Sequence, residues 1–116
     1  MLPAPHRMRR AEDFTLAVRR GRRAGSALVA VHLLMPPDVD RPARVGVVVS
    51  KAVGTAVTRT RVKRRLRALA AGRVHRLPRG ALAVVRANPA AAGATSATLG
   101  DDLDRALHRV LPGGMS

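Results

Sequence analysis

Cysteine, tryptophan and tyrosine are absent from this sequence, and Phe14 is its single aromatic residue. The absence of cysteine excludes disulfides and thiolate zinc sites, and it suits a reducing compartment. Long apolar runs are also missing. The longest, residues 27–35, contains His32 and is too short to span a bilayer, and the chain opens without a signal-peptide apolar region. The sequence therefore predicts a soluble cytoplasmic protein whose core is built from Ala, Val and Leu.

Acidic residues are scarce as well. Seven Asp and Glu oppose 22 Lys and Arg, which gives a formal net charge of +15. A domain this basic repels itself unless a polyanion is near, so the charge predicts a nucleic-acid partner. The few carboxylates begin helices or lie in a loop, and the four histidines lack metal-ligand spacing. We expect no catalytic residue, metal or cofactor in the protein alone.

Apolar periodicity and turn residues divide the chain into helices and strands. Acids at 12 and 13, bases at 19 and 20 and then Gly21 predict a short first helix. Residues 27–34 and 44–50 predict two strands that pair as a hairpin across the Pro-rich loop 36–42.

A helix is predicted from about residue 56 into the low 70s, with Thr55 as its N-cap. Residues 81–86 predict another strand, and Thr98 to Asp101 resembles a capping box that opens a last helix. The expected fold is an α/β (α+β) two-layer sandwich with a roughly four-stranded sheet and three helices, in the order α-β-β-β-α-β-α. We expect residues 1–10 to form a flexible basic arm, 11–111 a single RNA-binding domain and 112–116 a flexible tail.

The helix after Thr55 is the strongest candidate for the interface. A helical wheel buries Val62, Leu66 and Leu69 in a narrow stripe and leaves a broad cationic surface. No acid occurs between Asp40 and Asp101 to neutralise that surface, whereas merely solvated helix faces usually carry both signs. The predicted RNA-binding cations are Arg59, Arg61, Lys63, Arg64, Arg65 and Arg67. The start of the helix adds free backbone N–H groups for a phosphate at Gly54, Thr55 and Ala56.

Residues 46–67, GVVVSKAVGTAVTRTRVKRRLR, resemble the protein component of bacterial ribonuclease P. That family has a strand ending in Ser-Lys, then Gly, Ala-Val and an Arg-Asn-Arg helix with a basic continuation. The similarity extends over about residues 7–111. The sequence departs from the family in two ways: Thr60 stands where Asn is usual, and Phe14 alone remains of several cleft aromatics.

The resemblance implies a fold in which the basic helix makes a left-handed crossover. It also implies a function: to assist a catalytic RNA, which uses magnesium, in removing the 5′ leader of precursor tRNA. The basic helix would contact the catalytic RNA subunit, and a cleft between the sheet and the first helix would hold the leader. The cleft residues would be Phe14, Val18, His32, Lys51 and Arg86. Both Phe14 and His32 have an alternative as core residues.

Three other classes of protein fit parts of the sequence. A ribosomal or other structural RNA-binding protein would share the charge and the basic helix. A DNA-binding module would need a two-helix recognition unit or a dimerising heptad, and neither is found. A membrane-surface protein would need a wider apolar stripe on its basic helix. We therefore expect neither duplex DNA nor a membrane as a partner.

Overall fold

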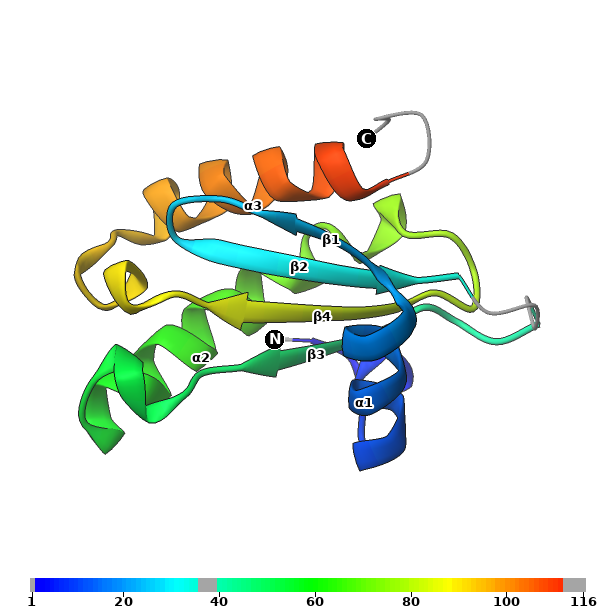
Figure 1. Ribbon diagram of the computed structural model, residues 1–116, viewed down its shortest axis with the longest axis horizontal. Helices are drawn as coiled ribbons and strands as arrows, with labels where there is room; N and C mark the ends of the chain where they lie inside the picture. The colour runs from blue at the N-terminus through cyan, green and yellow to red at the C-terminus, as the bar shows by residue number, and fades with distance from the viewer. Residues whose placement is uncertain (1, 36–39, 112–116) are drawn as a thin grey trace.

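The computed structural model describes residues 2–35 and 40–111 (Figure 1). The predicted tail 112–116 and the loop carboxylate Asp38 lie outside these residues. The three α-helices are α1 (Ala11–Arg20), α2 (Ala56–Ala71) and α3 (Ser96–Val110). The strands are β1 (Arg22–Gly25), β2 (Val29–Leu34), β3 (Arg44–Val48) and β4 (Leu82–Ala87). Four short 3-10 helices join them: η1 (Ala4–His6), η2 (Lys51–Val53), η3 (Val74–Arg76) and η4 (Pro89–Gly93).

The four strands form one mixed sheet in the order β1-β2-β4-β3. β1 and β2 form an antiparallel hairpin, β2 pairs antiparallel with β4, and β3 pairs parallel with β4. The α+β class, the helix count and the strand count are confirmed. The hairpin predicted between residues 27–34 and 44–50 is wrong, because β4 lies between these two strands. β4 is buried on both faces along most of its length, so it takes the centre of the sheet.

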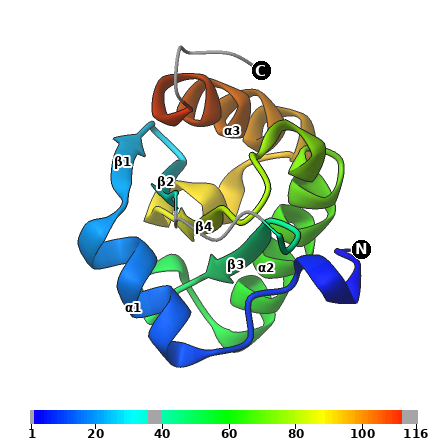
Figure 2. The ribbon, with the colours of Figure 1, turned by 90° about the vertical axis from the view of Figure 1, so that its right-hand side faces the viewer.

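The crossover from β3 through α2 to β4 is left-handed. In Figure 1 both strands run to the left and β4 lies above β3, while α2 passes behind the sheet; Figure 2 shows α1 and α2 on opposite sides of it. About 98% of such crossovers are right-handed, so sequence rules alone would have chosen the other hand.

Helices cover both faces of the sheet (Figure 2). α3 packs on β1 and β2, and α2 packs on β3 and on α3, over the larger core. α1 covers the opposite face above β2 and β4, where a smaller cluster holds Met8, Ala17, Leu82 and Val84. The two faces of the sheet thus carry different contents, one wholly aliphatic and one containing His32.

The first residues of the chain are part of the folded unit. Leu2 and Met8 are 3% and 7% exposed, and the N–H of Met8 donates to the carbonyl of Val45 at 3.0 Å. Arg7 makes a parallel bridge with Val45, so this segment runs along the free edge of β3. The sequence predicted a flexible arm over residues 1–10; the structure docks residues 2–8 because two apolar side chains in the arm reach the core.

Candidate nucleic-acid interface

α2 begins where the sequence predicts, and its first residues explain the Gly and Thr that precede it. Gly54 has φ +152°, a conformation that favours glycine, and a Cβ there would lie 3.1 Å from Cγ2 of Thr58. The Thr55 hydroxyl then accepts the N–H of Thr58 at 3.3 Å, which caps the helix. Gly54, Thr55 and Ala56 are all exposed, so this helix terminus is open to an anion.

The cations of α2 fall into two groups with different surroundings. Arg61 and Arg65 donate to the carbonyls of Ala92 and Ala94 at 3.2 and 2.8 Å, and thereby hold α2 against η4. On another side of the helix a shallow groove of about 290 Å³ is lined by Thr60, Lys63, Arg64, Arg67 and Ala68. The sequence treated all six cations alike; the contacts separate docking residues from free ones.

The charge of this helix is not balanced by any carboxylate of the described residues. Within the described ranges, none of the ion pairs involves a residue of α2, and the helix buries only Val62, Leu66 and Ala70. Leu69, predicted as buried, is half-buried instead. Arg64 and Arg67 are exposed, whereas Arg59 is half-buried and its Nε has no hydrogen-bond partner among the described residues. Guanidinium groups that keep unpaired N–H donors are suited to bidentate contacts with phosphates.

The predicted cleft residues gather mostly on the sheet face below α1. His32 of β2 lies opposite Val84 of β4 on one side and opposite Arg23 of β1 on the other. Arg86 is two residues beyond Val84 and therefore on the same face. Lys51 is exposed in η2, three residues after Val48, which pairs with Arg86, so it lies beyond the same end of the sheet.

His32 is an unusual residue in this face. Its side chain is 5% exposed, and neither ring nitrogen has a hydrogen-bond partner within the described chain. Burial, together with the charges of Arg86 and Arg23, lowers its pKa below the ordinary value of 6.5, so the ring is neutral at pH 7. Arg23 was missed from the sequence, because residues 22–25 were not recognised as a strand and its alignment with His32 depends on the β1–β2 register.

Phe14 of α1 also lies on this face, beside Gly46 of β3, and its ring contributes to packing. A Cβ added to Gly46 would lie 2.3 Å from Cε1 of the Phe14 ring, so the glycine makes room for the ring. The ring also packs against the cluster of Met8, Leu82 and Val84. Val18, one turn further along α1, is 36% exposed. The face therefore combines a half-buried aromatic ring, a buried imidazole and flanking guanidinium groups.

The carboxylates of the described residues are separated, and the two most engaged ones have structural partners. Asp102 accepts hydrogen bonds from Ser26, Leu28 and Val29, and Asp104 binds two arginines. No group of three metal-ligating side chains exists within residues 2–35 and 40–111. In the same residues no helix is long and apolar enough to cross a membrane.

A mixed sheet with helices on both faces, and a cationic helix that forms no ion pair among the described residues, place the chain in the class of small α+β proteins with a surface suited to nucleic acid. Comparison with known proteins gives the particular family. The sequence model of the family Ribonuclease P matches residues 2–111, so the chain belongs to this family. The chain is 55% identical over 121 aligned residues to the ribonuclease P protein component of Streptomyces avermitilis, covering 98% of each chain.

Solved structures show the same fold. The ribonuclease P protein of Staphylococcus aureus superimposes with a TM-score of 0.75 at 25% identity, covering 88% of this chain and 92% of that one. The protein from Thermotoga maritima superimposes with a TM-score of 0.77 at 23% identity, covering 91% of this chain and 98% of that one.

Proposed function

We propose that this chain is the protein subunit of ribonuclease P and assists the removal of the 5′ leader from precursor tRNA. Family membership over residues 2–111 supports the activity. The proposed mode of binding rests on one observation, the cationic side of α2 that carries Lys63, Arg64 and Arg67. There Arg64 and Arg67 are exposed and without ion pairs in the described chain. This side contacts the phosphates of the catalytic RNA subunit, and counterion release supplies much of the affinity.

The leader of precursor tRNA occupies the sheet face below α1 in this proposal. Single-stranded RNA is bound by cationic walls and flat stacking groups, and this face offers the half-buried ring of Phe14 and the exposed Arg86, while His32 is buried in the same face. Arg23 adds a second guanidinium beside His32. Having one aromatic ring rather than several makes base stacking a small part of the affinity and leaves most of it to charge.

The phosphodiester chemistry and its magnesium belong to the RNA subunit in this proposal. Magnesium needs clustered oxygen ligands, whereas the described carboxylates are dispersed over several elements, and Asp13, Asp102 and Asp104 are engaged by arginines, a hydroxyl or backbone N–H groups. The protein therefore binds and positions RNA. We propose the cytoplasm as its compartment, and neither duplex DNA nor a membrane as its partner.

The test is cleavage of a labelled precursor tRNA by the RNA subunit of a Streptomyces ribonuclease P at low magnesium, with and without this protein. We expect the protein to restore cleavage at the leader boundary and to have no activity without the RNA. The variant Arg64→Glu/Arg67→Glu should lose this effect. Tight RNA binding without restored cleavage would make the chain a structural RNA-binding protein instead.

A further inference from the structure

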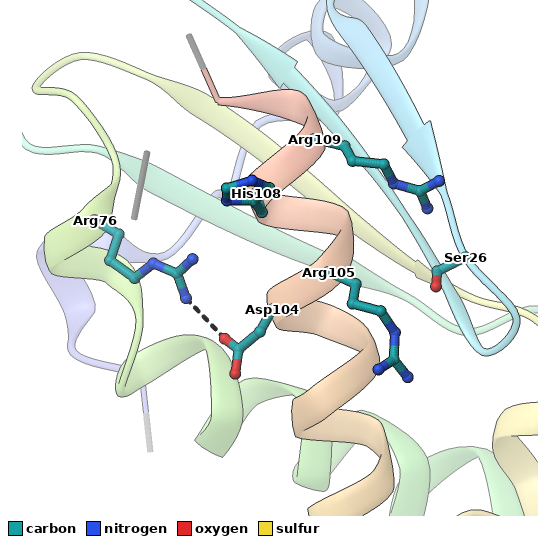
Figure 3. A pocket seen from close by; sticks show the side chains of 6 residues that line it. All are labelled: Ser26, Arg76, Asp104, Arg105, His108 and Arg109. Carbon is teal, nitrogen blue, oxygen red and sulfur yellow. Dashed lines mark hydrogen bonds and ion pairs between the residues drawn. The ribbon is translucent and has the colours of Figure 1, made fainter. Parts of the chain in front are cut away.

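A second cationic surface lies on α3, on the other side of the sheet from the face below α1, and it shares no lining residue with the groove on α2. It is an open groove of about 690 Å³ lined by Ser26, Arg76, Asp104, Arg105, His108 and Arg109 (Figure 3). α3 packs on β1 and β2, at one edge of the sheet, whereas α2 packs on β3 at the other edge. RNA bound to Lys63, Arg64 and Arg67 of α2 therefore does not by itself occupy the groove on α3.

The acids near this groove are already bound by other groups. Asp104 accepts from Nε and a terminal nitrogen of Arg73 at 2.6 and 3.2 Å, and from Arg76 at 2.7 Å. Asp102 is 2% exposed and uses both oxygens for Ser26 and for the N–H groups of Leu28 and Val29. Both carboxylates are therefore already engaged by other groups.

Two arginines on the same helix face keep positive charge available. Arg105 reaches Asp102 only at 3.7 Å, and its side chain is 65% exposed. Arg109 donates to the carbonyl of Gly25, a neutral acceptor, and forms no ion pair within residues 2–35 and 40–111. Asp101, one turn before Arg105, forms no ion pair within the described residues. Figure 3 shows both arginines extending from one side of α3, with His108 on the helix and Arg76 approaching from η3.

We propose that this groove binds the phosphodiester backbone of the catalytic RNA subunit at a segment different from the one on α2. The inference rests on the proposed function. Guanidinium forks match phosphate oxygens, and helix positions three and four apart present neighbouring donors. Apart from the imidazole of His108, the groove lining contains no ring and no large apolar side chain to anchor a protein partner.

The catalytic RNA fits the groove on α3 better than the leader does, because the leader is assigned to the face below α1. A folded RNA can surround a protein that measures 38 × 27 × 25 Å and contact both edges of its sheet. The contact clamps the protein between two RNA segments, and it is independent of sequence because it reaches only phosphates.

Cross-linking tests this directly, because the chain has no native cysteine. The variants His108→Cys in the groove, Arg64→Cys on α2 and Thr15→Cys on exposed α1 each receive a short photo-activatable group. Each is assembled with the Streptomyces RNA subunit, with and without precursor tRNA. We expect His108→Cys to cross-link to a segment of the RNA subunit that Arg64→Cys does not reach.

Cross-linking by Arg64→Cys alone, with His108→Cys no better than Thr15→Cys, would overturn this inference and leave the proposed function standing. So would a cross-link from position 108 to precursor tRNA only. If neither Arg64→Cys nor His108→Cys cross-linked to the RNA subunit, both this inference and the proposed function would be overturned.

Salt dependence provides a second measurement. Arg105→Gln/Arg109→Gln should flatten the slope of log affinity for the RNA subunit against log salt by about 0.7–0.9 units for each phosphate that the variant no longer neutralises. Arg105→Lys/Arg109→Lys keeps the charge and should keep the slope. Thermal unfolding of both variants shows whether removing the hydrogen bond to Gly25 disturbs the fold. An unchanged slope in the folded Gln variant would remove the groove from the interface.

Discussion

The carboxylate of Asp102 accepts the hydroxyl hydrogen of Ser26 at 2.6 Å and joins α3 to the turn between β1 and β2. The same carboxylate accepts the N–H groups of Leu28 and Val29 at 2.9 and 3.1 Å. Burial disfavours its charge, but these three hydrogen bonds outweigh burial and hold the pKa of Asp102 below its ordinary value. One side chain thus fixes the hairpin under the helix that carries the proposed second RNA surface.

Replacing Asp102 should therefore destabilise the protein. We expect Asp102→Asn to lower the free energy of unfolding by about 1.5–3 kcal/mol, since charged hydrogen bonds are lost and a buried N–H meets an amide donor. Its neighbour Asp101 is exposed, and Asp101→Asn should change stability by less than about 0.5 kcal/mol. Urea unfolding of the two variants measures the difference, and equal losses would show that the buried network contributes nothing special.

His32 should make stability depend on pH below about 6.5. Its folded pKa lies below the unfolded value of 6.5, so the unfolded chain binds more protons as the pH falls from about 6.5 toward the folded pKa. Stability should decline over that range, and His32→Phe should flatten the decline. Below about pH 4 both proteins should lose stability alike, because the pKa values of Asp102 and Asp104 are also lowered. Urea unfolding at stepped pH measures both effects; a decline that persists in His32→Phe would assign it to another group.

Gly46 should not tolerate a methyl group. An added Cβ would meet the Phe14 ring at 2.3 Å, so Gly46→Ala should cost about 1–3 kcal/mol of stability by overpacking. The double variant Gly46→Ala/Phe14→Leu should recover part of this loss, as expected for residues in contact. Gly93→Ala is the matched control, because nothing lies within 4 Å of an added Cβ there. Additive losses in the double variant would exclude the ring as the cause.

The two groups of α2 cations should respond differently to substitution, one in RNA affinity and the other in stability. Arg64→Ala should flatten the salt slope of RNA affinity by about 0.7–0.9 units, with stability unchanged. Arg65→Ala should lower stability by about 1 kcal/mol, since it removes the donor to the Ala94 carbonyl at 2.8 Å. Urea unfolding and binding titrations at several salt concentrations measure both. If the salt slope of Arg64→Ala matched wild type, the groove side of α2 would not face RNA.

Phe14 should affect the leader more than the body of the tRNA. In folded protein, Phe14→Ala should weaken binding of leader-bearing precursor more than binding of mature tRNA, and Phe14→Leu should retain the packing without the flat ring. Binding of both RNAs to the assembled enzyme gives the ratio. An equal loss on the two RNAs would make Phe14 a core residue only.

Local sequence was sufficient for most elements, because their signals are local. The Thr55 cap and the apolar stripe of α2 are set by neighbours within a turn or two. The start of α3 was predicted wrongly at Thr98: Thr95 is the cap, and its hydroxyl accepts the Thr98 N–H at 3.1 Å. Thr98 lies within the first turn instead, and its hydroxyl is 2.9 Å from that of Thr95.

Local sequence did not predict which strands pair with each other. The short strand β1 carries two arginines and little apolar periodicity, and it is held by its register with β2 and by α3. The separation of β2 from β3 depends on β4, which comes about 35 residues later in the chain than β3 and lies between them.

The sequence by itself determined that the protein is basic, that one helix lacks acidic partners, and which family its motif resembles. Charge and motif are properties of composition and spacing, so they need no coordinates. Only the tertiary structure decided which cations are free, since Arg61 and Arg65 are engaged by carbonyls about 30 residues away. It also decided that Arg23 lies beside His32 and that Arg105 and Arg109 share a groove with Arg76. Contacts between residues distant in sequence form only when the whole chain has folded, and these contacts divide its many arginines into those engaged in the fold and those left open for the proposed RNA contacts.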